Sequence, residues 1–398
     1  MAIKKVEEQY IQVNNHISNK EIKNALDLIK EMIRDSRQPN YIPDYEKLNE
    51  TYKFILKYTI KDVKDPQRPE IYRDLQLSIL NLADRLKNHI IINAPEFQTM
   101  QLANEQTKAE NMSGNQLNEW FQELKKYPKI PGEILAEPES TKRDQILENL
   151  FKWMWIKPDF TENDLTFTRQ LISDDNIPWH EKCLFVSALT LGLFTNFNTG
   201  KIHALIYAVK NRQDKVWQRA LTGLIIIFYL YDQRIYLYPD IAAQLEGLKE
   251  DESLDKSMEL VITQLFKSKE TEKITKKIRD EIMPEVAKLT PRLTEKLDLD
   301  NILGEDFSED KNPDWENFFK DTPDLYEKME ELSFLQMDGS DVFMGTFAYL
   351  KHFDFFKPVH NWFMPFYKEN PVLEKVLEHE DQIPDKYQME ETIEQIPF

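Results

Sequence analysis

Apolar residues recur along the chain at gaps of three and four positions, the spacing that places side chains on one face of an α-helix. The clearest stripe comprises Ile22, Ala25, Leu26, Ile29, Met32 and Ile33. Similar stripes run through residues 45–59 and 72–86, and proline-containing breaks precede both of them. Ser18 and Glu21 have the spacing of a capping box, which predicts a helix start at Ser18. Three helices joined by such short breaks are expected to pack antiparallel.

Cap-like pairs of the same spacing precede the next apolar stripes. Thr141 with Asp144, and Thr161 with Asp164, predict two further helix starts. Because apolar residues at helical spacing follow each pair, we expect the helical pattern to continue through the middle of the chain.

Two segments in this middle part match each other. Residues 183–206 and 220–243 align at an offset of 37, which places Leu189 on Ile226 and Ala204 on Ile241. A long apolar helix, a turn and a shorter helix, repeated at about this period, are typical of HEAT or armadillo repeats. Two interpretations stay open at this point, a true solenoid segment and an irregular bundle.

Loop-like segments divide the helices into three predicted regions. Residues 128–141 contain three prolines and a glycine, and residues 304–314 are acidic with a proline near their end. The expected regions are an N-terminal helical subdomain, a helical-repeat subdomain and an acidic, aromatic-rich helical C-terminal region, at residues 1–130, 131–300 and 301–398. Because the chain ends on apolar residues, we expect the last region to continue in a longer protein.

The composition argues against sheet-based folds. The 398 residues include 9 glycines and 12 valines, whereas sheets depend on β-branched residues and tight turns depend on glycine. The predicted fold is therefore all-α, an irregular α-α superhelix or helical-repeat array of HEAT or TPR type.

Two segments carry a family resemblance. The first contains RPEIYR at residues 68–73 and LNLAD at residues 80–84; the second runs from Tyr326 through GSDVFM at residues 339–344 to NWFMPF at residues 361–366. These segments, about 60 of 398 residues, resemble large bacterial proteins described as tetratricopeptide-repeat-like. The resemblance implies an α-helical superhelix with no assigned reaction. The TPR consensus of about 34 residues cannot be fitted anywhere in the chain.

The negative charge is concentrated in the last quarter of the chain. The net charge is −19, and residues 301–398 contain 8 basic and 23 acidic residues. The main basic cluster, at residues 267–279, is interleaved with acidic residues, which favours a helix laced with salt bridges. Since phosphate binding depends on Lys and Arg, we expect no nucleic-acid partner.

Motifs for catalysis, cofactors and metals are missing from the sequence. The single cysteine, Cys183, lies among apolar residues and is expected to be an inert core thiol. The seven histidines are scattered singly, without the spacing of a zinc site. No glycine-rich phosphate loop and no nucleophile elbow occurs. We therefore expect no catalytic residue, no metal and no cofactor.

Membrane insertion is not expected either. The longest apolar run, residues 221–231, is well short of the roughly 20 residues that span a bilayer. The N-terminus has no apolar core of signal-peptide length, so the predicted location is the cytoplasm.

Aromatic residues are concentrated near the C-terminus. Residues 343–367 contain ten aromatics, whereas the chain as a whole is 12% aromatic. Pro358 and Pro365 restrict helix continuation there, so we expect four side chains to be displayed for partner binding: His360, Trp362, Phe366 and Tyr367. The alternative is that the aromatics pack against neighbouring helices. Because the surroundings are acidic, the expected partner is a protein with an apolar surface rimmed by Lys or Arg.

The sequence therefore predicts a non-enzymatic scaffold of helical-repeat type that binds another protein. An all-α enzyme with acidic residues in a groove is the first alternative, and a HEAT-like nucleic-acid binder is the second. A deep concavity with converging carboxylates would favour the enzyme, and a broad face would favour the scaffold. The sequence leaves the identity of the partner and the oligomeric state open.

Overall fold

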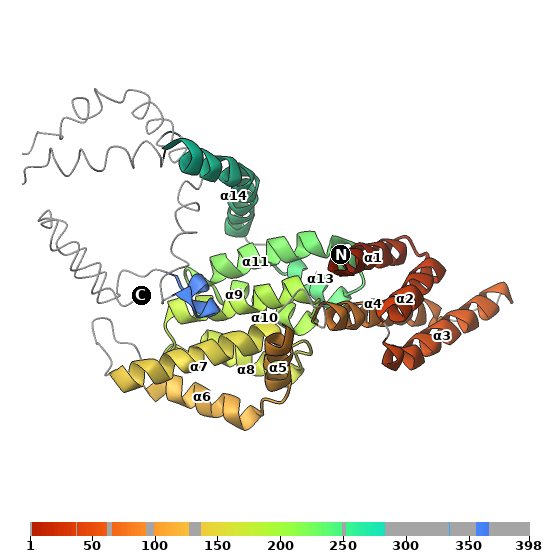
Figure 1. Ribbon diagram of the computed structural model, residues 1–398, viewed down its shortest axis with the longest axis horizontal. Helices are drawn as coiled ribbons and strands as arrows, with labels where there is room; N and C mark the ends of the chain where they lie inside the picture. Colours follow the sequence, from red (N-terminus) through yellow and green to blue (C-terminus); the bar gives the residue numbers. More distant parts are fainter. Residues whose placement is uncertain are drawn as a thin grey trace, which may run out of the picture. The chain divides into compact units, whose positions relative to one another are not determined.

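The computed structural model describes residues 2–36, 38–61, 66–92, 99–126, 137–248, 252–282, 334 and 356–365. Within these ranges the regular elements are helices and no strand occurs, which confirms the all-α prediction for this part of the chain (Figure 1). The chain divides into two compact units, Met1–Leu254 with Trp362–Ile396 and Asp255–Asn361 with Pro397–Phe398. The first unit continues across residue 130, and the predicted division into three regions stays a prediction.

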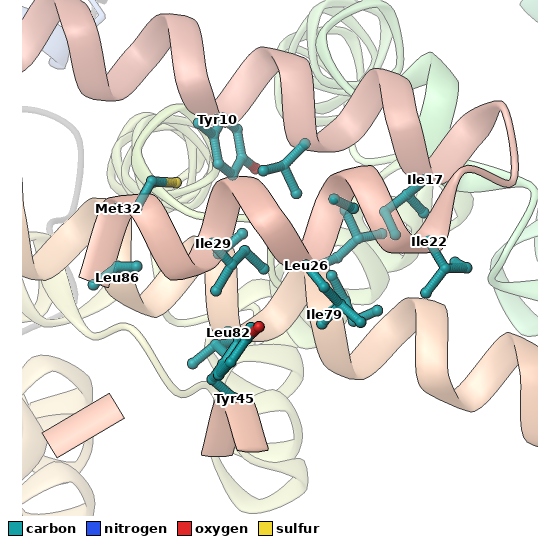
Figure 2. Close-up of a cluster of buried hydrophobic side chains, with 14 of the residues drawn as sticks. Tyr10, Ile17, Ile22, Leu26, Ile29, Met32, Tyr45, Ile79, Leu82 and Leu86 are labelled. Carbon is teal, nitrogen blue, oxygen red and sulfur yellow. The ribbon is translucent and has the colours of Figure 1, made fainter. Parts of the chain in front are cut away.

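Four helices and a short 3-10 turn form the N-terminal part of the first unit: α1 (Ala2–Ser18), α2 (Ile22–Ser36), η1 (Pro39–Tyr41), α3 (Ile42–Ile60) and α4 (Arg68–Ile92). Helix α2 packs on α1, α3 and α4, and their side chains meet in one hydrophobic cluster (Figure 2). All six residues of the first predicted stripe are buried in this cluster. The stripe on α3 is covered less well, since Tyr45 is buried but Leu56 is exposed.

The turn between α1 and α2 corrects the capping prediction at Ser18. Ser18 is the last residue of α1, and Lys20 adopts a positive φ of 63°. The amide of Glu21 then donates to the carbonyl of His16 at 2.7 Å, and the amide of Lys20 donates to the carbonyl of Ile17 at 3.0 Å. This pair of hydrogen bonds is a Schellman motif, so the signal at Ser18 marks the end of one helix rather than the start of the next.

The remaining helices of the first unit are α5 (Thr99–Glu110), α6 (Gly114–Lys126), α7 (Glu137–Ile156), α8 (Glu162–Ser173), α9 (Trp179–Thr195), α10 (Thr199–Asn211), α11 (Val216–Leu230), α12 (Asp232–Ile235) and α13 (Pro239–Glu246). The capping box before α8 is confirmed: the Asp164 amide donates to Thr161 Oγ1 at 3.3 Å, and the Thr161 amide donates to Asp164 Oδ2 at 2.7 Å. The predicted start at Thr141 is wrong, because α7 already begins at Glu137 and Thr141 lies inside it. Pro138 fits this earlier start, since proline is favoured in the first turn of a helix.

Helices α7 to α13, which we call the helical stack, pack against one another mainly through a few long helices. Helix α9 packs against α7 on one side and α11 on the other, and α10 packs against α8, α11 and α13. Figure 1 shows α7, α9 and α11 side by side. At the offset of 37, Leu189 is fully buried and Ile226 is half-buried, whereas Ala204 and Ile241 are both fully buried. The burial of aligned residues therefore agrees better between α10 and α13 than between α9 and α11. The repeat stays a prediction.

The second compact unit contains most of α14 (Glu252–Lys277), which the five-residue π-helix η2 (Ile278–Ile282) follows. Helix α14 exposes the apolar side chains of Leu260 and Phe266. A 3-10 helix, η5 (Val359–Phe363), lies near the C-terminal end of the described chain. No helix in the described ranges is long and apolar enough to cross a bilayer.

Candidate functional site

The four predicted partner-binding residues have different surroundings. His360 lies in η5 and is 4% exposed, whereas Trp362 in the same element is 37% exposed. Phe366 and Tyr367 lie outside the described residues. The short η5 begins directly after Pro358, as expected for a proline that restricts helix formation. Partner binding by these residues stays a prediction, and the structure places Trp362 at the surface but His360 in the interior.

The residue next to Trp362 packs against the body of the first unit. The ring of Phe363 stacks on the ring of Phe151 in α7, with centroids 5.6 Å apart and an interplanar angle of 26°. Phe151 is fully buried, because it belongs to the apolar stripe with which α7 faces its neighbours. Part of the aromatic segment therefore packs into a core, in line with the alternative weighed from the sequence.

A half-buried arginine, Arg219, holds the backbone of the same residue. Arg219 in α11 donates from Nη1 to the carbonyl of Phe363 at 2.7 Å and to Ser187 Oγ in α9 at 3.0 Å. Ser187 Oγ donates in turn to the carbonyl of Cys183 at 2.9 Å, so its lone pairs are available to the guanidinium. Burial lowers the pKa of Arg219. Among the described residues no carboxylate pairs with it.

We call residues 362–365 the strap, and we call Phe151, Ser187 and Arg219 the strap site. The strap site takes one residue from each of the adjacent helices α7, α9 and α11. It contacts an aromatic ring by stacking and a main-chain carbonyl by a charge-assisted hydrogen bond. Chemically, this arrangement can hold an aromatic residue of a peptide by its ring and its main-chain carbonyl.

A second unusual group is the buried lysine Lys201 in α10. Its Nζ donates to the carbonyl of Trp155 at 3.1 Å. Burial and the nearby cation of Lys157 lower the pKa of Lys201 to about 7. Lys157 itself is paired with Asp164 at 2.8 Å. Together, Lys201, Lys157 and Asp164 connect α7, α8 and α10 near the capping box at the start of α8.

Two buried ion pairs join further helices. Arg143 binds Glu181 through two hydrogen bonds of 2.7 and 2.8 Å, which connects α7 to α9. Asp84 accepts hydrogen bonds from Arg234 and from the hydroxyl of Tyr10, both at 2.6 Å, which connects α4, α12 and α1. Sequence analysis missed both pairs, because their partners are far apart in the sequence. The sequence feature that could have indicated them is an ionisable residue next to an apolar stripe, such as Asp84, which follows Leu82 and Ala83.

The described residues were also compared with the donor sets of metal sites and with reactive thiols. They contain no group of three or more His, Cys, Asp or Glu side chains that could hold a metal ion. Cys183 is buried, and burial raises the pKa of its thiol to about 11. The thiol is therefore protonated at neutral pH, as expected for an inert core cysteine.

The strap site is thus formed by side chains on three packed helices, and in this structure it contacts a segment of the same chain. Its interpretation depends on this geometry alone. Comparisons with protein-family models, with curated proteins and with solved structures found no match to this chain.

Proposed function

We propose that this protein is a non-enzymatic protein–protein interaction scaffold of helical-repeat type. The observation that supports the proposal is the strap site, where Phe151 and Arg219 hold Phe363 and Ser187 holds Arg219. Stacked helical hairpins present extended surfaces of this kind. The order of packing, α7 on α9 on α11 and α8 on α10 on α13, supports an α-α superhelix.

The proposed partner is a protein with apolar pockets rimmed by Lys or Arg. The net charge of −19 favours a basic rim, because opposite charges accelerate association. Of the predicted contact residues, Trp362 is exposed in the structure, and Phe366 and Tyr367 follow it closely in the sequence. The cytoplasmic location remains a prediction from the sequence.

The enzyme alternative has one specific observation in its favour, the pKa of about 7 at Lys201. A lysine with such a pKa can act as a base or nucleophile near neutral pH if substrate reaches it. However, Lys201 is 2% exposed and hydrogen-bonded to the carbonyl of Trp155. The geometry therefore favours a structural role for this lysine.

Reconstitution with a purified partner tests the proposed function. The partner is first captured from native cells, identified and purified, and its affinity for the chain is then measured by calorimetry. We expect Trp362→Ala, Phe366→Ala and Tyr367→Ala each to weaken binding about tenfold or more without lowering the melting temperature, since aromatic anchors dominate interface energies. The matched control is Tyr229→Ala, because Tyr229 is 82% exposed on α11.

Two results would contradict the proposal. One is a complex whose affinity is unchanged in all three variants, which would show that these aromatics do not contact the partner. The other is the absence of any protein that binds the purified chain directly.

A further inference from the structure

We propose that the strap site is a docking site for aromatic peptide segments of a partner protein, and that the strap occupies it in competition with them. This inference deepens the proposed function and rests on it. The ligand class is a peptide that presents one aromatic ring to Phe151 and the main-chain carbonyl of the same residue to Arg219, as Phe363 does at the end of the 3-10 helix η5.

The hydrogen bonding of Arg219 distinguishes it from the structural arginines of this chain. Arg143 and Arg234 are both buried, and each is paired with a carboxylate. The distance from Arg143 Nε to Glu181 Oε1 is 2.7 Å, and that from Arg234 Nη1 to Asp84 Oδ2 is 2.6 Å. Arg219 is instead satisfied by a hydroxyl and a carbonyl, both uncharged. A carbonyl is present in every peptide, so another chain can supply the same acceptor. The guanidinium therefore selects for backbone geometry and not for one particular side chain.

The floor of the strap site also favours an exchangeable aromatic ligand. Phe151 is fully buried with the strap in place, and its ring contacts Phe363 on one side and Trp155 on another, the latter edge-on at 5.8 Å. Without the strap, the stacking contact between Phe151 and Phe363 would be lost. A free-energy gain then accompanies the docking of any flat apolar ring on this face.

The strap is remote in the sequence from the helices that hold it. Phe363 is 144 positions from Arg219 in the sequence. Closing a long loop costs conformational entropy that grows only slowly with length, and a tethered ligand acts at an effective concentration of up to about millimolar. A partner segment can displace the strap if its concentration and affinity together outweigh the strap's own affinity and effective concentration.

The test uses the full chain and a synthetic peptide of residues 356–367 with a fluorescent label, followed by fluorescence anisotropy. We expect the peptide to bind Phe363→Ala chain about tenfold or more tightly than wild-type chain, because the variant's own strap no longer competes. A peptide that carries the Phe363→Ala change should not bind. Arg219→Gln, combined with Phe363→Ala, should weaken peptide binding about tenfold, whereas the exposed control Arg34→Gln should not.

Stability controls keep the test decisive. Phe363→Leu retains apolar volume but loses the stacked ring, so it replaces Phe363→Ala if the latter unfolds. If both variants fail to fold, the strap is a structural element and the inference is wrong. It is equally wrong if a folded variant does not bind the peptide. Neither result bears on the capture assay above, which tests partner binding through Trp362, Phe366 and Tyr367 without the peptide.

Discussion

At the scale of single residues, the most informative feature is the burial of ionisable groups at helix crossings. Arg143 and Glu181 are 5% and 1% exposed, and each satisfies the charge of the other. Arg143 Nη1 also donates to the carbonyl of Leu124 at 2.9 Å, which brings in α6. Such pairs contribute little net stability when intact, but loss of one member leaves a buried charge without its partner.

Glu181→Gln should therefore be strongly destabilising. We expect a loss of about 3–5 kcal/mol in the free energy of unfolding, because the guanidinium of Arg143 stays buried without a counter-charge. Urea denaturation measures this loss. The control is Asp44→Asn, which breaks a half-exposed pair with Arg85 and should cost about 0–1 kcal/mol. Similar losses in both variants would contradict the explanation.

Lys201 should make stability depend on pH. Burial, together with Lys157, lowers its pKa from 10.5 to about 7 in the folded state. Between these values the unfolded chain binds more protons than the folded chain, so this lysine makes stability rise with pH from about 7 to 10.5, by at most ~1.4 kcal/mol per pH unit. Below pH 7 its contribution is constant and unfavourable.

The measurement is urea denaturation at several pH values in wild type and Lys201→Met. We expect Lys201→Met to remove the rise of the free energy of unfolding with pH that Lys201 causes, and to raise stability at pH 6. The matched control is Lys210→Met, because Lys210 lies on the same helix and is exposed. Equal slopes in wild type and Lys201→Met would show that Lys201 titrates normally.

At the scale of elements, α9 is a central helix of the helical stack, because it packs against α7, α8, α10 and α11. Its residues are apolar around most of its circumference, which is typical of a helix buried on all sides. Two glycines allow its neighbours to approach closely. A Cβ at Gly192 in α9 would lie 2.7 Å from the carbonyl of Trp155, and a Cβ at Gly223 in α11 would meet the side chain of Thr190, with its Cγ2 at 3.2 Å.

Gly223→Ala should therefore destabilise the packing of α11 on α9. We expect a loss of about 1–3 kcal/mol, the usual cost of overpacking a core, measured by thermal or urea denaturation. The second substitution Thr190→Ala, made in the same chain, should restore part of the loss because it removes the clashing atoms. Gly247→Ala is the control, since the nearest atom to its Cβ would be 3.7 Å away. A stable Gly223→Ala chain would contradict the close packing of these helices.

At the scale of the whole molecule, the first compact unit combines the N-terminal helices with the helical stack. The link is the cluster around Asp84, to which Tyr10 of α1 and Arg234 of α12 donate. Leu237 also contributes to the N-terminal hydrophobic cluster. These contacts explain why residues 1–254 form one compact unit across the boundary that proline and glycine suggested near residue 130.

Asp84→Asn should uncouple the two parts. The substitution removes the counter-charge of Arg234, and we expect a loss of about 3–5 kcal/mol in the free energy of unfolding. Hydrogen exchange should show earlier loss of protection in α1 than in α9. Glu181→Gln serves as the control, because it lowers stability inside the helical stack and should not affect α1 selectively. Uniform loss of protection in both variants would argue against a separate link.

Local patterns in the sequence determined the helices. The stripe from Ile22 to Ile33 is buried in α2, and the Thr161–Asp164 capping box opens α8, because periodicity and capping depend on residues only a few positions apart. Tertiary structure alone decided which charges are buried and where the aromatic segment packs. Arg219 and Phe363 are 144 positions apart, and Asp84 and Arg234 are 150 apart. No local spacing encodes such pairs, because they form only when packing brings distant helices together.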